Sequence, residues 1–197
     1  MFVNVLFIVA AYCLGSVSSA IITCRLMGLA DPRTFGSNNP GATNVLRIGG
    51  KSAKIAAAIT LLGDSLKGFI PVFIALMFNL NAAVIALIGI AAFLGHLYPI
   101  FFGFKGGKGV ATAFGVILAI SPWVAASLLV TWLIMAFGLK ISSLSALIAA
   151  VLAPVFIWFI LHSSIFLLMS IFISVFLIIR HKSNIKKLLS GKESKIS

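Results

Sequence analysis

Residues 110–139 read VATAFGVILAISPWVAASLLVTWLIMAFGL, a run without a single charged residue. A helix of about 20 residues crosses the hydrocarbon core of a bilayer, so this run is too long for one span without a large tilt. Its middle carries Ser121-Pro122, and a proline ends or kinks a helix near the preceding residue. The run is therefore predicted to form two helices, Val110–Ile120 and Pro122–Leu139, of which the first is short enough to be a partial span.

The rest of the chain has the same apolar character. Of its 197 residues, 61% are hydrophobic and only 9% are charged, whereas soluble domains carry about 25% charged residues. This composition predicts an all-α, polytopic membrane protein with about seven transmembrane helices, and we expect one integral membrane domain over residues 1–197. The other apolar runs are Phe2–Ile22, Ala53–Phe78, Ala82–Leu97, Ser142–Leu161 and Ser164–Ile179.

Charge in the connecting segments supports seven helices and gives their direction. If the chain forms seven transmembrane helices, the loops at residues 79–81, 121–122 and 162–163 lie on one side of the membrane, and they contain no Lys or Arg. Cytoplasmic loops carry the excess of positive charge, so the N-terminus is predicted outside and the C-terminus in the cytoplasm. A six-helix arrangement spoils this asymmetry. The basic residues assigned to the cytoplasmic side are Arg25, Arg33, Arg47, Lys51, Lys54, Lys105, Lys108, Lys140, Arg180 and the lysines of the tail.

The net charge of +12, with only three acidic residues, has more than one explanation. In a soluble protein such an excess indicates nucleic-acid binding. In a membrane protein, the lysines and arginines that orient the helices account for about half of it. An anionic substrate is expected to account for much of the rest, and no nucleic-acid partner is expected.

The first of two glycine-rich, basic stretches is Asp31–Arg47, DPRTFGSNNPGATNVLR. Glycine lets backbone N–H groups turn toward an anion, and an arginine adds charge-assisted donors suited to phosphate. The Gly-x4-Gly spacing resembles a Walker A loop, but Ala42 occupies the lysine position and no hydrophobic strand precedes it, which excludes nucleotide binding of that type. The residues alone leave an ordinary turn-rich loop as an equal alternative.

The second stretch, Gly95–Thr112, reads GHLYPIFFGFKGGKGVAT. Lys105 and Lys108 lie among three glycines, which allows a phosphate to approach backbone and ammonium groups together. Val110 begins a predicted helix whose N-terminus points at this segment. Membrane anchoring would explain the lysines but not the glycines, so phosphate binding is the favoured interpretation.

Three titratable residues close to these stretches fall inside predicted helices. Histidine has an unperturbed pKa of about 6.5, which makes His96 a candidate general base, although a histidine at a membrane interface is often structural. Asp64 and Lys67 lie at i and i+3 on one helix face. A structural ion pair is the favoured reading for Asp64, and Lys67 is near enough to reach the site. Three scattered histidines and three acids form no metal-binding pattern, so no metal is expected.

Six motifs follow one another along the chain: Asp31-Pro32-Arg33, GSNNPGATNVLR, Asp64-Ser65-Leu66-Lys67-Gly68, GHLYPIFFGFKGGKGVAT, Lys140-Ile141-Ser142-Ser143-Leu144 and RHKSNIKKLLSGKE. Taken in order, these motifs resemble one family, the bacterial acyl-phosphate:glycerol-3-phosphate acyltransferases (the PlsY family). The resemblance runs from Gly15-Ser16 to the tail and shows no departure at a motif position. It implies seven helices with the N-terminus outside, in the bacterial cytoplasmic (inner) membrane.

The resemblance also implies a reaction: transfer of a fatty acyl group from acyl phosphate to glycerol 3-phosphate, giving lysophosphatidic acid in phospholipid synthesis. It implies no cofactor, and as partners the two substrates, membrane lipid and the soluble enzyme that makes acyl phosphate. Because acyl phosphate is an activated mixed anhydride, the site needs positioning, charge stabilisation and proton removal rather than a covalent nucleophile.

The expected roles follow from this chemistry. Lys105 is predicted as the main phosphate cation and leaving-group stabiliser, and His96 as the base or an orienting group, unless the acceptor's own phosphate takes the proton. The alternative function is a transporter or channel for organic phosphate anions, which needs polar groups across the membrane, and a structural scaffold is a more distant one. The predicted substrate-binding residues are Ser37, Asn39, Gly41, Ala42, Thr43, Asn44, Arg47, Lys67, Lys108, Ser142 and Asn184.

Overall fold

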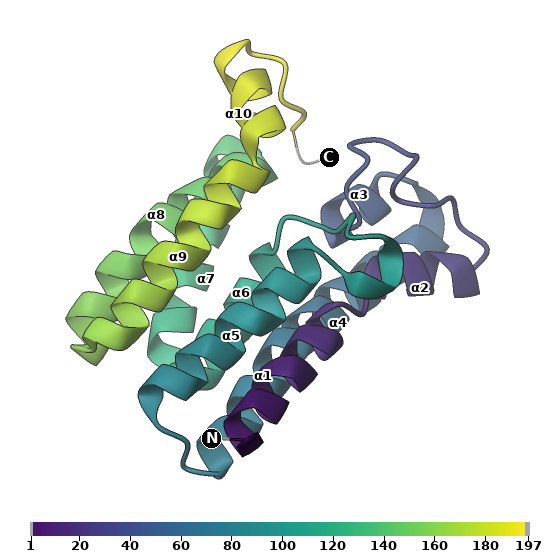
Figure 1. Cartoon of the computed structure of the whole chain (residues 1–197). Coiled ribbons are helices and arrows are strands. Elements are labelled where there is room, and N and C mark those ends of the chain that lie inside the picture. Colours follow the sequence, from purple (N-terminus) through teal and green to yellow (C-terminus); the bar gives the residue numbers. More distant parts are fainter. Residues whose placement is uncertain (1, 196–197) are drawn as a thin grey trace. The chain divides into compact units, whose positions relative to one another are not determined.

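The computed structural model describes residues 2–195, and over this range its regular elements are all helices (Figure 1). Four helices are long and apolar enough to cross a membrane, or six if each of two bent pairs is one span. The all-helical class is thereby confirmed. The helices are α1 Phe2–Gly15, α2 Ser19–Leu26, α3 Ala42–Leu46, α4 Gly50–Met77, α5 Ala82–Leu97, the 3-10 helix η1 Ile100–Phe102, α6 Val110–Ile120, α7 Pro122–Leu139, α8 Ser142–Leu161, α9 Ser164–Arg180 and α10 Lys182–Leu189.

The first of two compact units, which ends at Ala119, packs its long helices together at glycines. Gly15 of α1 lies against the backbone of Ala92 in α5, and Gly68 of α4 lies against the backbone of Thr112 in α6. A Cβ atom at either glycine would overlap those backbone atoms. Small residues at helix contacts are typical of membrane proteins, because they let the backbones approach closely.

The first apolar run forms two helices, not the single helix predicted over Phe2–Ile22. α1 ends at Gly15 and α2 begins at Ser19, with a bend of 42° between them. At the break, the carbonyl of Val17 accepts a hydrogen bond of 2.7 Å from the ammonium of Lys67 in α4, 50 positions later in the chain. The Lys67 ammonium replaces the backbone hydrogen bond that the Val17 carbonyl would accept in a continuous helix. Nothing in the sequence around Val17 reveals this partner.

The predicted break within residues 110–139 is confirmed, because α6 and α7 meet at Ser121-Pro122. The hydroxyl of Ser121 accepts a 3.3 Å hydrogen bond from the backbone N–H of Val124 and so caps α7. Asn81 and Ser163 cap α5 and α9 in the same way. Each of the three loops without basic residues therefore ends in a polar cap that starts the next helix.

The second unit begins at Ile120 and contains α7 to α10. Ser174 of α9 donates a hydrogen bond of 2.6 Å to the carbonyl of Ala150 in α8. α9 then bends by 60° into α10, which continues beyond the end of α9 (Figure 1). The sequence predicted a charged tail here but not the helix.

Candidate active site

The first glycine-rich stretch folds around one side chain, that of Asn44 in α3. Its Oδ1 accepts a hydrogen bond from the backbone N–H of Ser37 at 2.9 Å, and its Nδ2 donates to the carbonyls of Pro32 and Phe35 at 2.8 and 2.9 Å. Gly36 has a φ of +59°, and the Asn44 amide occupies the space where its Cβ would lie. Asn44 is 1% exposed, so it shapes this loop from the inside.

The other predicted phosphate ligands of this stretch lie nearer its surface. α3 is anchored by Val45, which packs on Ala20, Cys24 and Ala56, so the opposite side of the short helix faces outward. Gly41 precedes α3 in an extended conformation. Four of these predicted ligands are half-buried, namely Ser37, Asn39, Gly41 and Ala42. Two others, Thr43 and Arg47, are exposed.

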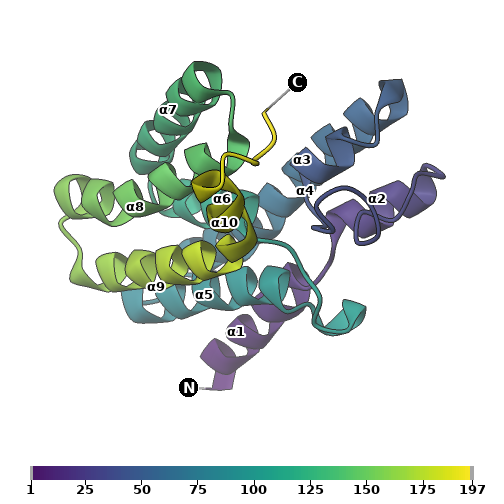
Figure 2. The same cartoon turned by 90° about the horizontal axis from the view of Figure 1, so that it is seen from above.

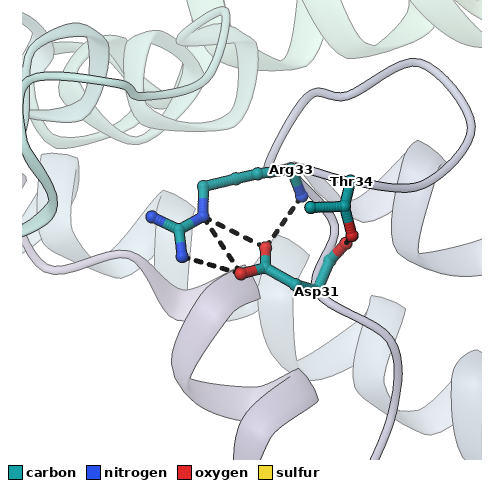
Figure 3. A network of polar contacts seen from close by, with 3 residues as sticks. All are labelled: Asp31, Arg33 and Thr34. Carbon is teal, nitrogen blue, oxygen red and sulfur yellow. Dashed lines mark hydrogen bonds and ion pairs between the residues drawn. The ribbon is translucent and has the colours of Figure 1, made fainter.

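A bidentate ion pair closes the start of the same stretch (Figure 3). Arg33 donates from Nε and Nη2 to the carboxylate of Asp31 at 3.1, 3.2 and 2.7 Å, and its backbone N–H donates to Oδ1 at 2.9 Å. The backbone N–H and hydroxyl of Thr34 both donate to the Asp31 carbonyl. The hydrogen bonds from Arg33 hold the pKa of the Asp31 carboxyl below its usual 3.8. The charge of Arg33 is thus largely balanced within the turn.

The second glycine-rich stretch rests on the last turn of α5. The backbone N–H of Gly107 donates to the carbonyl of His96 at 3.2 Å. A Cβ at Gly107 would overlap the His96 imidazole, and one at Gly106 would overlap the His96 carbonyl. Gly107 is buried, whereas Lys105 is exposed and Lys108 is half-buried. The glycines therefore let the loop lie directly on α5, with the two lysines on either side.

Three titratable side chains lie in the interior behind this loop. Asp64, Lys67 and His96 are 3%, 5% and 7% exposed. The Lys67 ammonium lies 2.9 Å from Oδ1 of Asp64, and Nδ1 of His96 lies 3.7 Å from the same oxygen. The ion pair expected from the i, i+3 spacing is confirmed. The ammonium of Lys67 faces Asp64 and the Val17 carbonyl, and its predicted contact with substrate stays a prediction.

Within the first unit, both stretches lie at one end. The loop between α2 and α3 and the loop between α5 and α6 are found at the end opposite the N-terminus (Figures 1 and 2). This is the arrangement expected if both connections face the same side of a membrane. Over residues 2–195, no group of three or more His, Cys, Asp and Glu side chains could hold a metal ion.

The second unit carries a polar cluster of its own, which the sequence analysis identified only in part. Ser142 begins α8 and is half-buried. Asn184 of α10 is 7% exposed, and its Nδ2 donates to Oε1 of Glu193 at 2.7 Å. The hydroxyl of Ser143 donates to the same oxygen at 2.9 Å. The scarcity of acids, three in the chain, was the signal that could have drawn attention to Glu193.

His181 is a second residue of this unit that the sequence analysis did not select. It is 2% exposed, and its Nδ1 lies 2.8 Å from the carbonyl of Leu177. It stands at the junction of α9 and α10, three positions before Asn184. This spacing places the two side chains on one side of a helical turn.

Comparison with known proteins gives a consistent result. A family model described as glycerol-3-phosphate acyltransferase matches residues 5–191. A glycerol-3-phosphate acyltransferase of Chromobacterium violaceum is 53% identical over 195 residues, which covers 96% of this chain and 93% of the relative. One of Methylococcus capsulatus is 55% identical over 186 residues, covering 94% and 92%.

Two solved structures of PlsY (YgiH), described as an integral membrane glycerol 3-phosphate acyltransferase, are also similar. The glycerol 3-phosphate form matches with a TM-score of 0.93 and 39% identity, covering 98% of this chain and 96% of the other. The lysophosphatidic acid form matches with a TM-score of 0.90 and 38% identity, covering 98% and 95%. These likenesses extend over both units of the chain.

Proposed function

Because the chain belongs to the glycerol-3-phosphate acyltransferase family, we propose that it transfers a fatty acyl group from acyl phosphate to glycerol 3-phosphate. The products are lysophosphatidic acid and inorganic phosphate. The observation that carries this proposal is the pair of glycine-rich, basic loops at one end of the first unit, in a chain similar to a protein crystallised in glycerol 3-phosphate and lysophosphatidic acid forms. Both substrates present phosphates, which such loops suit.

The exposed cations take the leading roles in this proposal. Arg47 and the backbone and hydroxyl donors of residues 37–43 bind a phosphate, and Asn44 contributes by holding the loop in shape. Lys105 binds phosphate and stabilises the charge that develops on the leaving group, since fixed cations act most strongly where charge appears in the transition state. The supporting residues are Lys108, Ser142 and Asn184.

The proton of the attacking hydroxyl goes either to His96 or to the phosphate of glycerol 3-phosphate itself. His96 is buried, with its Nδ1 toward Asp64 and its other edge toward Gly107. These positions suit an orienting group as well as a base. The acceptor oxygen then attacks the acyl carbon, the bond from that carbon to the phosphate oxygen breaks, and phosphate leaves with the bonding electron pair.

The proposal includes a topology: seven spans in the bacterial cytoplasmic membrane, with the N-terminus outside and the C-terminus in the cytoplasm. The absence of Lys and Arg from residues 79–81, 121–122 and 162–163 supports it, with α6 as the short seventh span. In a background lacking Cys13 and Cys24, cysteines at Asn81 and Ser163 should react with an impermeant thiol reagent in intact cells. Labelling at Ser190 from outside would contradict the orientation.

A soluble enzyme that makes acyl phosphate is the proposed partner.

The donor is the sharpest test of the function. Purified protein in nanodiscs receives glycerol 3-phosphate with either acyl phosphate or acyl-CoA, with and without a chelator. Lysophosphatidic acid should form with acyl phosphate in both conditions and hardly at all with acyl-CoA. Equal turnover with acyl-CoA would contradict the proposed donor. No product from either donor, in protein shown to be folded, would favour transport of organic phosphates instead.

A further inference from the structure

Asp64 is a buried charge that the proposed chemistry does not use. It lies in α4, a membrane-crossing helix by length and composition, and is 3% exposed. Charged side chains in such a segment are costly, and where they occur they are paired and usually functional. The ion pair with Lys67 accounts for how the charge is tolerated. It does not account for the second group that the same oxygen faces, the imidazole of His96.

The position of the Asp64 carboxylate is fixed from one side by Lys67. The Lys67 ammonium contacts Oδ1 of Asp64 at 2.9 Å and donates to the carbonyl of Val17 at 2.7 Å. This carbonyl belongs to the break between α1 and α2. Both residues of the ion pair lie in α4, and the Val17 carbonyl holds the ammonium from outside that helix, so the carboxylate has little freedom to move away from His96.

On the other side, the imidazole separates Asp64 from the second glycine-rich loop. Its Nδ1 is 3.7 Å from the carboxylate, and its Nε2 is the atom nearest to where a Cβ at Gly107 would lie. The His96 carbonyl also accepts the N–H of Gly107. The ring is therefore held between a charge and the backbone of the loop that carries Lys105 and Lys108.

We propose that Asp64 is a positioning residue for acyl transfer: it holds the His96 imidazole against Gly107 and so fixes the loop that places Lys105 and Lys108 at the phosphates. Asp64 itself touches neither substrate. A carboxylate on one edge of an imidazole orients the ring and its tautomer. This inference rests on the proposed function for its kinetic test, and on the structure alone for its test on the loop.

The kinetic test separates positioning from simple stabilisation of the fold. Asp64→Asn leaves the buried Lys67 charge without a counter-charge and risks misfolding, so the decisive variant is Asp64→Asn with Lys67→Met, which removes both charges. In nanodiscs, this neutral pair should insert and still show a KM for a phosphate substrate raised about tenfold, with a lower kcat, because misplacing a binding group by a fraction of an ångström weakens catalysis. Lys67 is itself a predicted substrate ligand, so the loss should exceed that of Lys67→Met alone, and an equal loss in the two variants would also overturn the proposal. Wild-type kcat and KM values in the folded neutral pair would overturn the proposal.

The matched control is Thr60→Val, one turn earlier in α4. Thr60 is fully buried, and among residues 2–195 its hydroxyl has no hydrogen-bond partner, so kcat and both KM values should stay unchanged. Hydrogen exchange without substrate gives the independent test: the neutral pair should speed exchange at residues 103–109 but not at residues 36–44. Equal rates at residues 103–109 in variant and wild type would also overturn the proposal. If the wild type makes no lysophosphatidic acid, the proposed function fails, and the exchange result still decides the role of Asp64.

Discussion

The two glycine-rich loops differ in what holds them. The first, residues 36–47, is held from within by the neutral amide of Asn44, which makes three hydrogen bonds to the backbone of its own stretch. The second, residues 103–109, has Gly106, Gly107 and Gly109 against the end of α5 and is backed by the charged residues Asp64 and Lys67. The first loop should therefore fail when a hydrogen bond is lost, and the second when volume is added or a charge behind it is removed.

The largest effect is expected where both loops act alike, at their exposed cations. Arg47→Ala and Lys105→Ala should each lower kcat/KM about 100-fold or more while the protein still inserts. A charge-assisted hydrogen bond contributes about 1.5–3 kcal/mol in binding, and stabilisation of transition-state charge adds to it. The measurement is lysophosphatidic acid formation by purified variants. Lys51→Ala, which removes an exposed lysine at the start of α4, serves as the control.

The chemistry of the second cation gives a finer variant of this test. Lys105→Arg keeps the charge but replaces a compact ammonium with a planar fork, so it should restore only part of the activity. Near-wild-type turnover in Lys105→Ala would show that this loop does not hold the reacting phosphate.

Added volume should separate the two loops. In Gly107→Ala, the new methyl group meets the His96 ring, which is itself confined by Asp64, and kcat/KM should fall about 10- to 100-fold through a displaced loop. In Gly41→Ala, the methyl group comes within 2.9 Å of the Asn39 amide, the far end of a flexible side chain. That variant should lose far less activity. If Gly107→Ala and Gly41→Ala lowered kcat/KM equally, the second loop would not be more rigidly supported than the first.

Loss of hydrogen bonds should affect the first loop, which Asn44 holds in shape, more than the second. Asn44→Ala leaves the N–H of Ser37 and the carbonyls of Pro32 and Phe35 without their partner, and part of this cost is recovered as the loop opens to water. We expect about tenfold weaker binding of glycerol 3-phosphate, equivalent to ~1.4 kcal/mol, measured by calorimetry. Asn44→Asp should not rescue it, because a carboxylate accepts from Ser37 but cannot donate to the two carbonyls.

The smallest effect is expected at the Asp31–Arg33 pair, which is more than a third exposed. The folded-state pKa of Asp31 lies below 3.8, so the pair stabilises the protein above pH 3.8 and loses this contribution as the pH falls through the lower, folded value. Asp31→Asn should cost less than ~1 kcal/mol at neutral pH, since exposed pairs are screened by water. Melting temperatures of variant and wild type should differ slightly at pH 7 and converge in strong acid.

The sequence predicted those features whose cause is local. Ser121-Pro122 breaks a helix because proline lacks an N–H and serine caps the next turn, and both residues are visible in the sequence. The break after Gly15 was missed because it depends on Lys67, which approaches from another helix. The cluster at Glu193 was missed for a similar reason, since its carboxylate joins residues of α8 and α10.

For the loops, residue type predicted polarity but not direction. Asn44 and Thr43 are neighbouring polar residues, yet one turns into the loop and the other faces outward. The spacing of glycines likewise predicted close approach to some group. It could not distinguish an anion from the His96 ring, which is what Gly107 meets.

The shortness of α6 has a consequence for where the reaction takes place in the lipid. Its 11 residues rise by only about 16 Å, roughly half of the ~30 Å hydrocarbon thickness. With Ser121 at the outer surface, as the proposed topology requires, the Val110 end lies well below the cytoplasmic boundary of the bilayer. The second glycine-rich loop, which carries Lys105 and Lys108, would then lie at the depth in the bilayer at which acyl chains begin. A lipid-like donor could reach it by lateral diffusion within its leaflet, and turnover should vary with the chain length of the surrounding lipids.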